Sequence, residues 1–96
     1  MSSRRLLQGY LDHLGHERRL SANTVESYTR DIEALLALAG EQPLDALRTH
    51  DIRHYAAKLH GRGLHARSIA RMLSSWRGFY RYLARDHGYG ENPCLG

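Results

Sequence analysis

Apolar residues recur every three or four positions along most of this chain, which is the spacing of helices that bury one face. Glycines and short polar residues interrupt the pattern and supply the caps and breaks that helices require. We therefore expect four helices: one ending at Gly15, one from a cap at Ser21 or Asn23 to Gly40, one capped by Thr49 and broken at residues 61–63, and one from His65 to Asp86 that is ended by Gly88. No segment shows the alternation typical of strands, so the predicted fold is an all-α, small four-helix bundle.

The fourth predicted helix separates most sharply into two faces. At 100° per residue its apolar positions fall on one side: Ile69, Met72, Leu73, Trp76, Phe79, Tyr80 and Leu83. The opposite side carries Arg67, Arg71, Ser74, Gly78, Arg81 and Arg85, with Arg77 at its flank. A solvated helix face usually mixes charges of both signs, yet no Asp or Glu lies between Asp51 and Asp86, where eight Arg and Lys residues lie. A face of one sign favours a polyanion, and duplex nucleic acid is the commonest large one.

Composition restricts the class of protein. The chain has 96 residues, of which 42% are hydrophobic and 25% charged, as is typical of one small folded domain. Residues 1–51 hold six Arg against eight acidic residues, whereas residues 52–96 hold eight Arg and Lys against two, so we expect a binding surface in the second half. Cys94 has no disulfide partner in the chain, and there is neither a signal peptide nor an apolar run of membrane-spanning length. These features predict a cytoplasmic protein.

The residues predicted to contact DNA come from two helices. From the fourth we select Arg67, Ser68, Arg71, Ser74, Arg77 and Arg81, and from the second Thr24, Ser27 and Arg30. Arginines bind phosphates and guanine edges, and the start of a helix offers unpaired backbone N–H groups to a phosphate. Ser74 and Gly78 are small and would let the helix backbone approach a groove wall. We expect Arg71→Glu to abolish duplex binding while the helical circular dichroism stays intact.

Other interpretations of the same residues stay open. The arginine face could be a solvated surface, a protein-interaction surface for an acidic partner, or part of a helix that lies on an anionic membrane. The polar residues at the start of the second helix could simply cap it. Trp76 lies within the apolar stripe, so we expect a core residue rather than a stacking platform for single strands.

No set of residues indicates catalysis or a cofactor. His50 and His54 are four positions apart, as in many metal sites, but no third ligand is placed to complete one. We therefore expect surface histidines, and the same holds for His13 and His16. Cys94 has no catalytic neighbour. The sequence predicts no metal, no other cofactor and no catalytic residue in this chain.

Two blocks of sequence resemble the N-terminal core-binding domain, of SAM-like fold, of bacterial tyrosine recombinases. The first block matches the family pattern at Ser21, Thr24, Tyr28, Arg30, Asp31 and Ile32. The second block and a closing dipeptide match at Gly63, Leu64, Ser68, Ile69, Arg71, Leu73, Ser74, Arg77, Phe79, Tyr80, Leu83 and Asn92-Pro93. The likeness covers residues 6–93 and is greatest to the Xer recombinases, XerC more than XerD. Trp76 stands where the family usually has a smaller residue. Gly78 stands where Ser is common, at a cost to the helix of about 0.5–1 kcal/mol relative to Ala.

The resemblance implies one half of a C-shaped clamp on duplex DNA, with the second and fourth helices crossing the major groove of a recombination site. Residues 1–90 would form the DNA-binding domain, and residues 91–96 would begin a linker to a catalytic domain outside this chain. That domain, and none of the six tyrosines present here, would supply the nucleophile for strand cleavage. The parent enzyme would cooperate with a second Xer-type recombinase, for example to resolve chromosome dimers at the nucleoid. We expect the isolated domain to be monomeric and not to bind a membrane.

Overall fold

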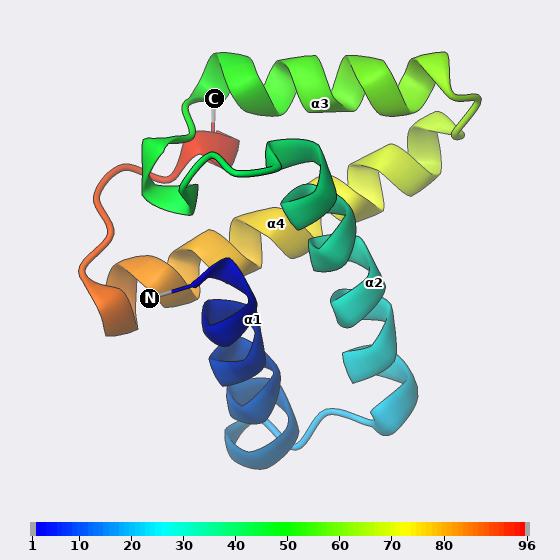
Figure 1. Cartoon of the computed structure of the whole chain (residues 1–96). Helices are drawn as coiled ribbons and strands as arrows, with labels where there is room; N and C mark the ends of the chain where they lie inside the picture. The colour runs from blue at the N-terminus through cyan, green and yellow to red at the C-terminus, as the bar shows by residue number, and fades with distance from the viewer. Residues whose placement is uncertain (1, 96) are drawn as a thin grey trace.

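A computed structural model describes residues 2–95 and contains four α-helices within that range (Figure 1). They are α1 (Ser3–Asp12), α2 (Ala22–Ala39), α3 (Thr49–Gly61) and α4 (Ala66–His87). Three short helical turns complete the structure: η1 (His13–Glu17), η2 (Leu44–Ala46) and η3 (Pro93–Leu95). No strand occurs between residues 2 and 95, so the predicted all-α, four-helix fold is confirmed.

The other three helices pack around α4. In Figure 1, α1 and α2 lie side by side and α4 crosses them, while α3 runs along the top of the view. The centre of the core is the aromatic stripe of α4, where Trp76, Phe79, Tyr80 and Leu83 are at most 2% exposed. The Tyr80 hydroxyl donates to the backbone carbonyl of Leu44 at 2.7 Å, which attaches the loop before α3 to the core. The prediction that Trp76 is a core residue is confirmed.

Most helix ends follow the predicted signals. The Ser21 hydroxyl accepts from the backbone N–H of Thr24 at 3.2 Å and caps α2. Gly40 and Gly88 end α2 and α4 with positive φ values of 61° and 69°, which favour glycine. The predicted cap at Thr49 is wrong by one position. Thr49 is already the first residue of α3, and the carboxylate of Asp51 accepts from the backbone N–H of the preceding Arg48 at 2.9 Å.

The end of α1 differs from the prediction. The helix does not stop at Gly15 but continues through Glu17 as the wider turn η1, in which the N–H of Arg18 donates to the carbonyl of His13, five residues back, at 3.2 Å. This wider turn keeps Leu14 fully buried. The prediction that His13 is a surface residue is also wrong, because its side chain is only 14% exposed and its ring packs against those of Tyr10 and Tyr82, with centroid distances of 6.4 and 5.6 Å.

The segment after α4 folds back onto the bundle. Pro93 and Cys94 are buried, and η3 packs against both α3 and α4. The Asn92 side chain donates to the carbonyl of Arg77 at 3.2 Å and accepts from the backbone N–H of Cys94 at 2.9 Å. A linker beginning at residue 91 stays a prediction, but residues 92–94 are held in place by these contacts.

Candidate nucleic-acid interface

A groove between α2 and α4 brings together residues from both predicted sets. Thr24 and Ser27 line it from α2, and Arg71 and Ser74 line it from α4. On each helix the two residues lie about one turn apart beside the buried stripe, so the packing of the helices places all four along one groove. The groove encloses about 260 Å³, which is less than the usual pocket for a small molecule. An open groove of this size is better suited to part of an extended ligand.

Asp31 forms the polar floor of this groove. Its carboxylate is only 4% exposed and accepts hydrogen bonds from Arg71, Nη2 to Oδ1 at 2.9 Å and Nε to Oδ2 at 3.4 Å. The Ser75 hydroxyl donates to Oδ2 at 2.7 Å, and the Trp76 indole N–H donates to the backbone carbonyl of Asp31 at 2.7 Å. Burying a carboxylate without such partners would cost several kcal/mol. The network therefore fixes α2 against α4.

The ion pair changes what is expected of Arg71. The sequence predicts an arginine free to neutralise a phosphate, whereas in the structure its charge is balanced by Asp31. Asp31 occupies two of the five guanidinium N–H groups, and the Arg71 side chain is still 61% exposed, so three donors are left for a ligand. A contact between Arg71 and DNA stays a prediction. Arg71→Glu would place a second carboxylate beside Asp31, so we now expect this variant to lose its fold as well.

The remaining α4 residues occupy different surroundings. Arg67 lies exposed in the first turn, and half-buried Ser68 follows it. Arg81 is exposed near the other end of the helix. Neither arginine forms an ion pair with any residue in the range 2–95. Both therefore keep a full positive charge for a ligand.

Arg77 is oriented toward the C-terminal segment and not into the groove. It is half-buried, and its Nε donates to the carbonyl of Cys94 at 3.4 Å. Its own carbonyl accepts from Asn92. A DNA contact by Arg77 stays a prediction, and the structure gives this residue a role in holding η3.

The predicted residues of α2 make local contacts. The hydroxyls of Thr24 and Ser21 lie 2.9 Å apart, and Ser21 also caps the helix, so the capping interpretation holds for Ser21. Arg30 is exposed, and its Nη2 donates to the Ser27 hydroxyl at 3.3 Å while Nη1 lies 4.0 Å from a carboxylate oxygen of Glu26. Exposed pairs of this kind are weak, so Arg30 can exchange Glu26 for a phosphate at little cost.

Gly78 does not open the arginine face as predicted. A Cβ at this position would lie 3.0 Å from the Tyr10 hydroxyl oxygen, and a Cβ at Gly9 would lie 2.7 Å from that of Tyr82. Both glycines therefore allow α1 and α4 to approach closely. The missing side chain of Gly78 is needed for the tyrosine of the neighbouring helix and not for a groove wall.

The histidines show no sign of a metal site. His50 and His54 are exposed, as predicted, and no three potential ligands gather anywhere in residues 2–95. Within the same range no helix combines the length and apolar character that crossing a bilayer requires.

Five of the six tyrosines, and Cys94, have raised pKa values. Burial raises the pKa of Tyr10 to about 12, and it also raises the pKa values of Tyr55, Tyr80, Tyr82 and Tyr89 above the usual value for tyrosine. Burial likewise raises the pKa of the Cys94 thiol to about 12. An activated nucleophile requires the opposite shift.

Comparison with known proteins assigns the family. The family model for the phage integrase N-terminal SAM-like domain matches residues 7–87, which include the whole α2–α4 groove. This chain belongs to that family. Tyrosine recombinase XerC of Alcanivorax borkumensis is 46% identical over 86 residues, an alignment that covers 90% of this chain and 28% of that protein.

Further relatives of this SAM-like domain carry the same name. Tyrosine recombinase XerC of Ralstonia pickettii is 44% identical over 95 residues, covering 94% of this chain and 29% of that protein. Tyrosine recombinase XerC 1 of Ralstonia nicotianae is 48% identical over 92 residues, covering 91% of this chain and 28% of that protein. The chain thus spans less than a third of the length of these relatives, and no solved structure matches it. The predicted likeness to Xer recombinases, and to XerC in particular, is confirmed.

Sequence reasoning assigned no role to Asp31, the residue that organises the groove of this SAM-like domain. A signal was present, because Asp31 lies three positions after Tyr28 and four before Leu35, on the buried side of α2. Asp is rarely buried without a partner, and the arginine-rich helix offered one. The sequence alone does not show which arginine pairs with Asp31.

Proposed function

We propose that this domain binds one side of duplex DNA, with α2 and α4 placed at the major groove. The observation that carries the proposal is the convergence of Thr24, Ser27, Arg71 and Ser74 in one groove. Beyond the groove, the solvent-exposed face of α4 carries arginines and no carboxylate until Asp86. A major groove about 12 Å wide accepts a helix of this kind.

The residues of this interface would contact different parts of the DNA. Arg67 and Arg81, which carry unbalanced charges, would neutralise phosphates and release counterions. Arg71, oriented by Asp31, would present its remaining N–H groups in a fixed direction, as is required for reading a guanine edge. The hydroxyls of Ser27 and Ser74 would donate to phosphate oxygens.

For the parent protein we infer a site-specific tyrosine recombinase of the Xer type. The support is the name shared by the relatives, tyrosine recombinase XerC, and the match to their N-terminal part. In that protein the domain would clamp a recombination site for strand exchange, with cleavage carried out by residues outside this chain. The parent protein would act together with a second Xer-type recombinase. It would resolve chromosome dimers at the nucleoid, in the cytoplasm.

The test is the binding of this 96-residue chain to a short labelled duplex across salt concentrations. We expect a Kd of about 10⁻⁴ to 10⁻⁶ M and an affinity that falls steeply between about 50 and 200 mM salt, with a log–log slope of about −0.9 for each phosphate neutralised. No detectable binding at the lowest salt would overturn the proposal. That outcome would favour an acidic protein partner for the same face, although no contact described above supports one.

A further inference from the structure

A second concave site lies on α4, beyond the groove, where η1 meets the C-terminal half of the helix. Arg18 lines it from the end of η1, Arg81 and Arg85 line it from α4, and the Tyr10 side chain lies among them. None of the observations used for the α2–α4 groove involves Arg18. The site joins a residue of the α1–α2 connection to the arginine face.

Two of the three arginines in this site have no balancing carboxylate. Arg85 pairs with Asp86, Nε to Oδ1 at 2.7 Å, and the nearby Glu17 pairs with His13. Arg18 and Arg81 form no ion pair within residues 2–95. Two like charges are thus held in one concave site, and the nearby carboxylates Asp86 and Glu17 pair with Arg85 and His13 at its edge. An anion would relieve the repulsion between them.

The Tyr10 hydroxyl is a third donor facing the same site. Its ring is fixed against Phe79 and Tyr82, with centroid distances of 5.3 and 5.1 Å. Both Arg18 and Arg81 are near enough to counteract part of the rise that burial causes in the pKa of Tyr10. The hydroxyl makes no hydrogen bond to another group of the described chain, although it is not sealed from solvent. Its proton is therefore available to a ligand oxygen.

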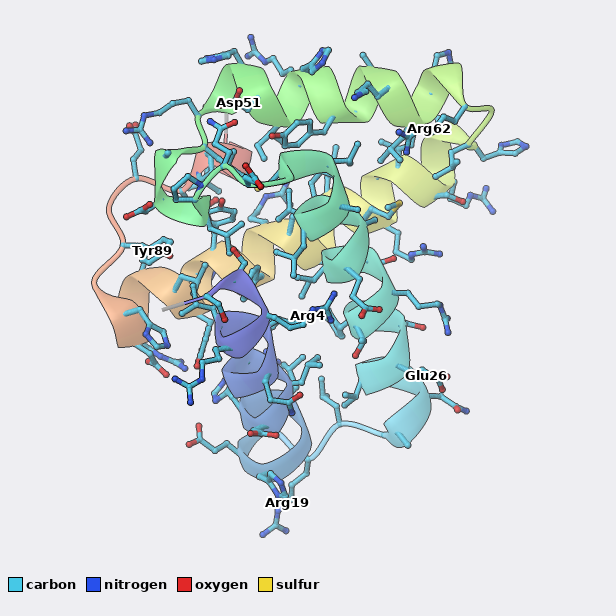
Figure 2. The ribbon with its side chains drawn as sticks, in the orientation of Figure 1. Arg4, Arg19, Glu26, Asp51, Arg62 and Tyr89 are labelled. Carbon is cyan, nitrogen blue, oxygen red and sulfur yellow. The ribbon has the colours of Figure 1, made fainter. Side chains whose placement is uncertain are left out.

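The wider turn η1 is what brings Arg18 to this place. The N–H of Arg18 bonds to the carbonyl of His13, five residues back, and both residues line the site together with residues of α4. The next residue, Arg19, has a left-handed φ of 53° and its side chain points away from the bundle at its lower end (Figure 2). Two adjacent arginines thus have opposite surroundings, one lining the site and one pointing into solvent.

We propose that Tyr10, Arg18 and Arg81 form a binding site for one phosphodiester group of a DNA strand, an inference that rests on the proposed duplex binding. Ser74, which would donate to a phosphate at the α2–α4 groove, and Arg81 are seven residues apart, or about 10 Å along the helix axis, close to the width of the major groove. A duplex seated with one backbone at the α2–α4 groove therefore brings its other backbone to this site. The two guanidinium groups and the phenol donate to the phosphate oxygens.

The experiment compares Arg18→Gln with Arg19→Gln in the duplex-binding assay. Both variants lose one positive charge, at neighbouring exposed positions, so a difference between them reports the site and not net charge. We expect Arg18→Gln to weaken binding about five- to ten-fold near 0.1 M salt and to make the salt slope less negative by about 0.9. Arg19→Gln is expected to weaken binding less than two-fold, with helical circular dichroism unchanged in both.

A second variant separates hydrogen bonding from charge. Tyr10→Phe keeps the ring and is expected to weaken binding about three-fold with the salt slope unchanged, because the hydroxyl carries no charge. Equal losses for Arg18→Gln and Arg19→Gln would overturn the phosphate site and leave the duplex-binding proposal standing. Failure of the unmodified chain to bind any duplex would overturn both.

Discussion

The two halves of α4 are attached to the bundle by different physics. The N-terminal half is fixed to α2 by a buried ionic network, in which Asp31 accepts from Arg71 and Ser75. The C-terminal half is fixed to α1 by tyrosine side chains lying over glycines, Tyr10 over Gly78 and Tyr82 over Gly9. Both halves present arginines to solvent on the same face.

The difference decides what each arginine is free to do. In the N-terminal half, Arg71 is paired with Asp31. It can therefore offer oriented hydrogen-bond donors to a ligand, but little net charge. Where the fold is held by aromatic packing, Arg81 is left without a partner and offers a full charge. Along the sequence the two residues are indistinguishable, each an arginine on the polar side of one amphipathic helix.

The largest expected contrast is in stability. We predict that Arg71→Ala lowers the free energy of unfolding by about 2 kcal/mol, because the carboxylate of Asp31 stays buried with Ser75 as its only side-chain donor. Arg81→Ala should change it by less than about 0.5 kcal/mol. Urea denaturation followed by circular dichroism measures both values. Similar losses for the two variants would mean that the halves of α4 are not held differently.

A smaller effect is expected at the glycine contacts. Gly9→Ala gains helix propensity, but the new Cβ lies 2.7 Å from the Tyr82 hydroxyl oxygen, and we predict a net destabilisation of about 1 kcal/mol. Combining it with Tyr82→Phe removes the atom that collides and should restore the stability of the Tyr82→Phe single variant. A double-mutant cycle measures this coupling. A cycle without coupling would contradict close packing at this end.

The smallest contrast concerns the salt dependence of duplex binding. Asp31→Asn combined with Arg71→Gln removes one charge of each sign, so the log–log slope should change by less than about 0.3. Arg81→Gln should make the slope less negative by about 0.9, since it removes an unbalanced charge. If the double variant altered the slope as much as Arg81→Gln, Arg71 would act as a free cation despite its pairing with Asp31.

The architecture was predictable from spacing and turn chemistry alone. Apolar positions spaced three or four apart predicted four helices, and Gly40 and Gly88 marked two of their ends because glycine readily adopts the positive φ that often follows the last turn. The buried aromatic stripe of α4 followed from the same periodicity. Local rules worked here because each signal lies within a few residues of the structure that it specifies.

The details that failed depend on contacts between distant residues. Asp31 and Arg71 are forty positions apart, so the pairing that orients the arginine has no local signature. Gly78 was interpreted as an opening for a ligand because its neighbour Tyr10 lies on another helix. His13 is half-buried because its ring packs against Tyr10 of α1 and Tyr82 of α4, and the second contact has no local signature. The apolar stripe of α4 was predicted, but the burial of Ser75 and Tyr82 and the partners of its arginines were not.

The position of Arg18 depends on the number of residues in the turn η1. Shortening residues 13–17 by a single residue would restore the ordinary α-helical ring and rotate the position of Arg18 about the helix axis by about 100°. Arg18 would then move out of the site that it shares with Arg81. In this connection the number of residues matters as much as their identity. An insertion or deletion there would move Arg18, whereas many substitutions would leave it in place.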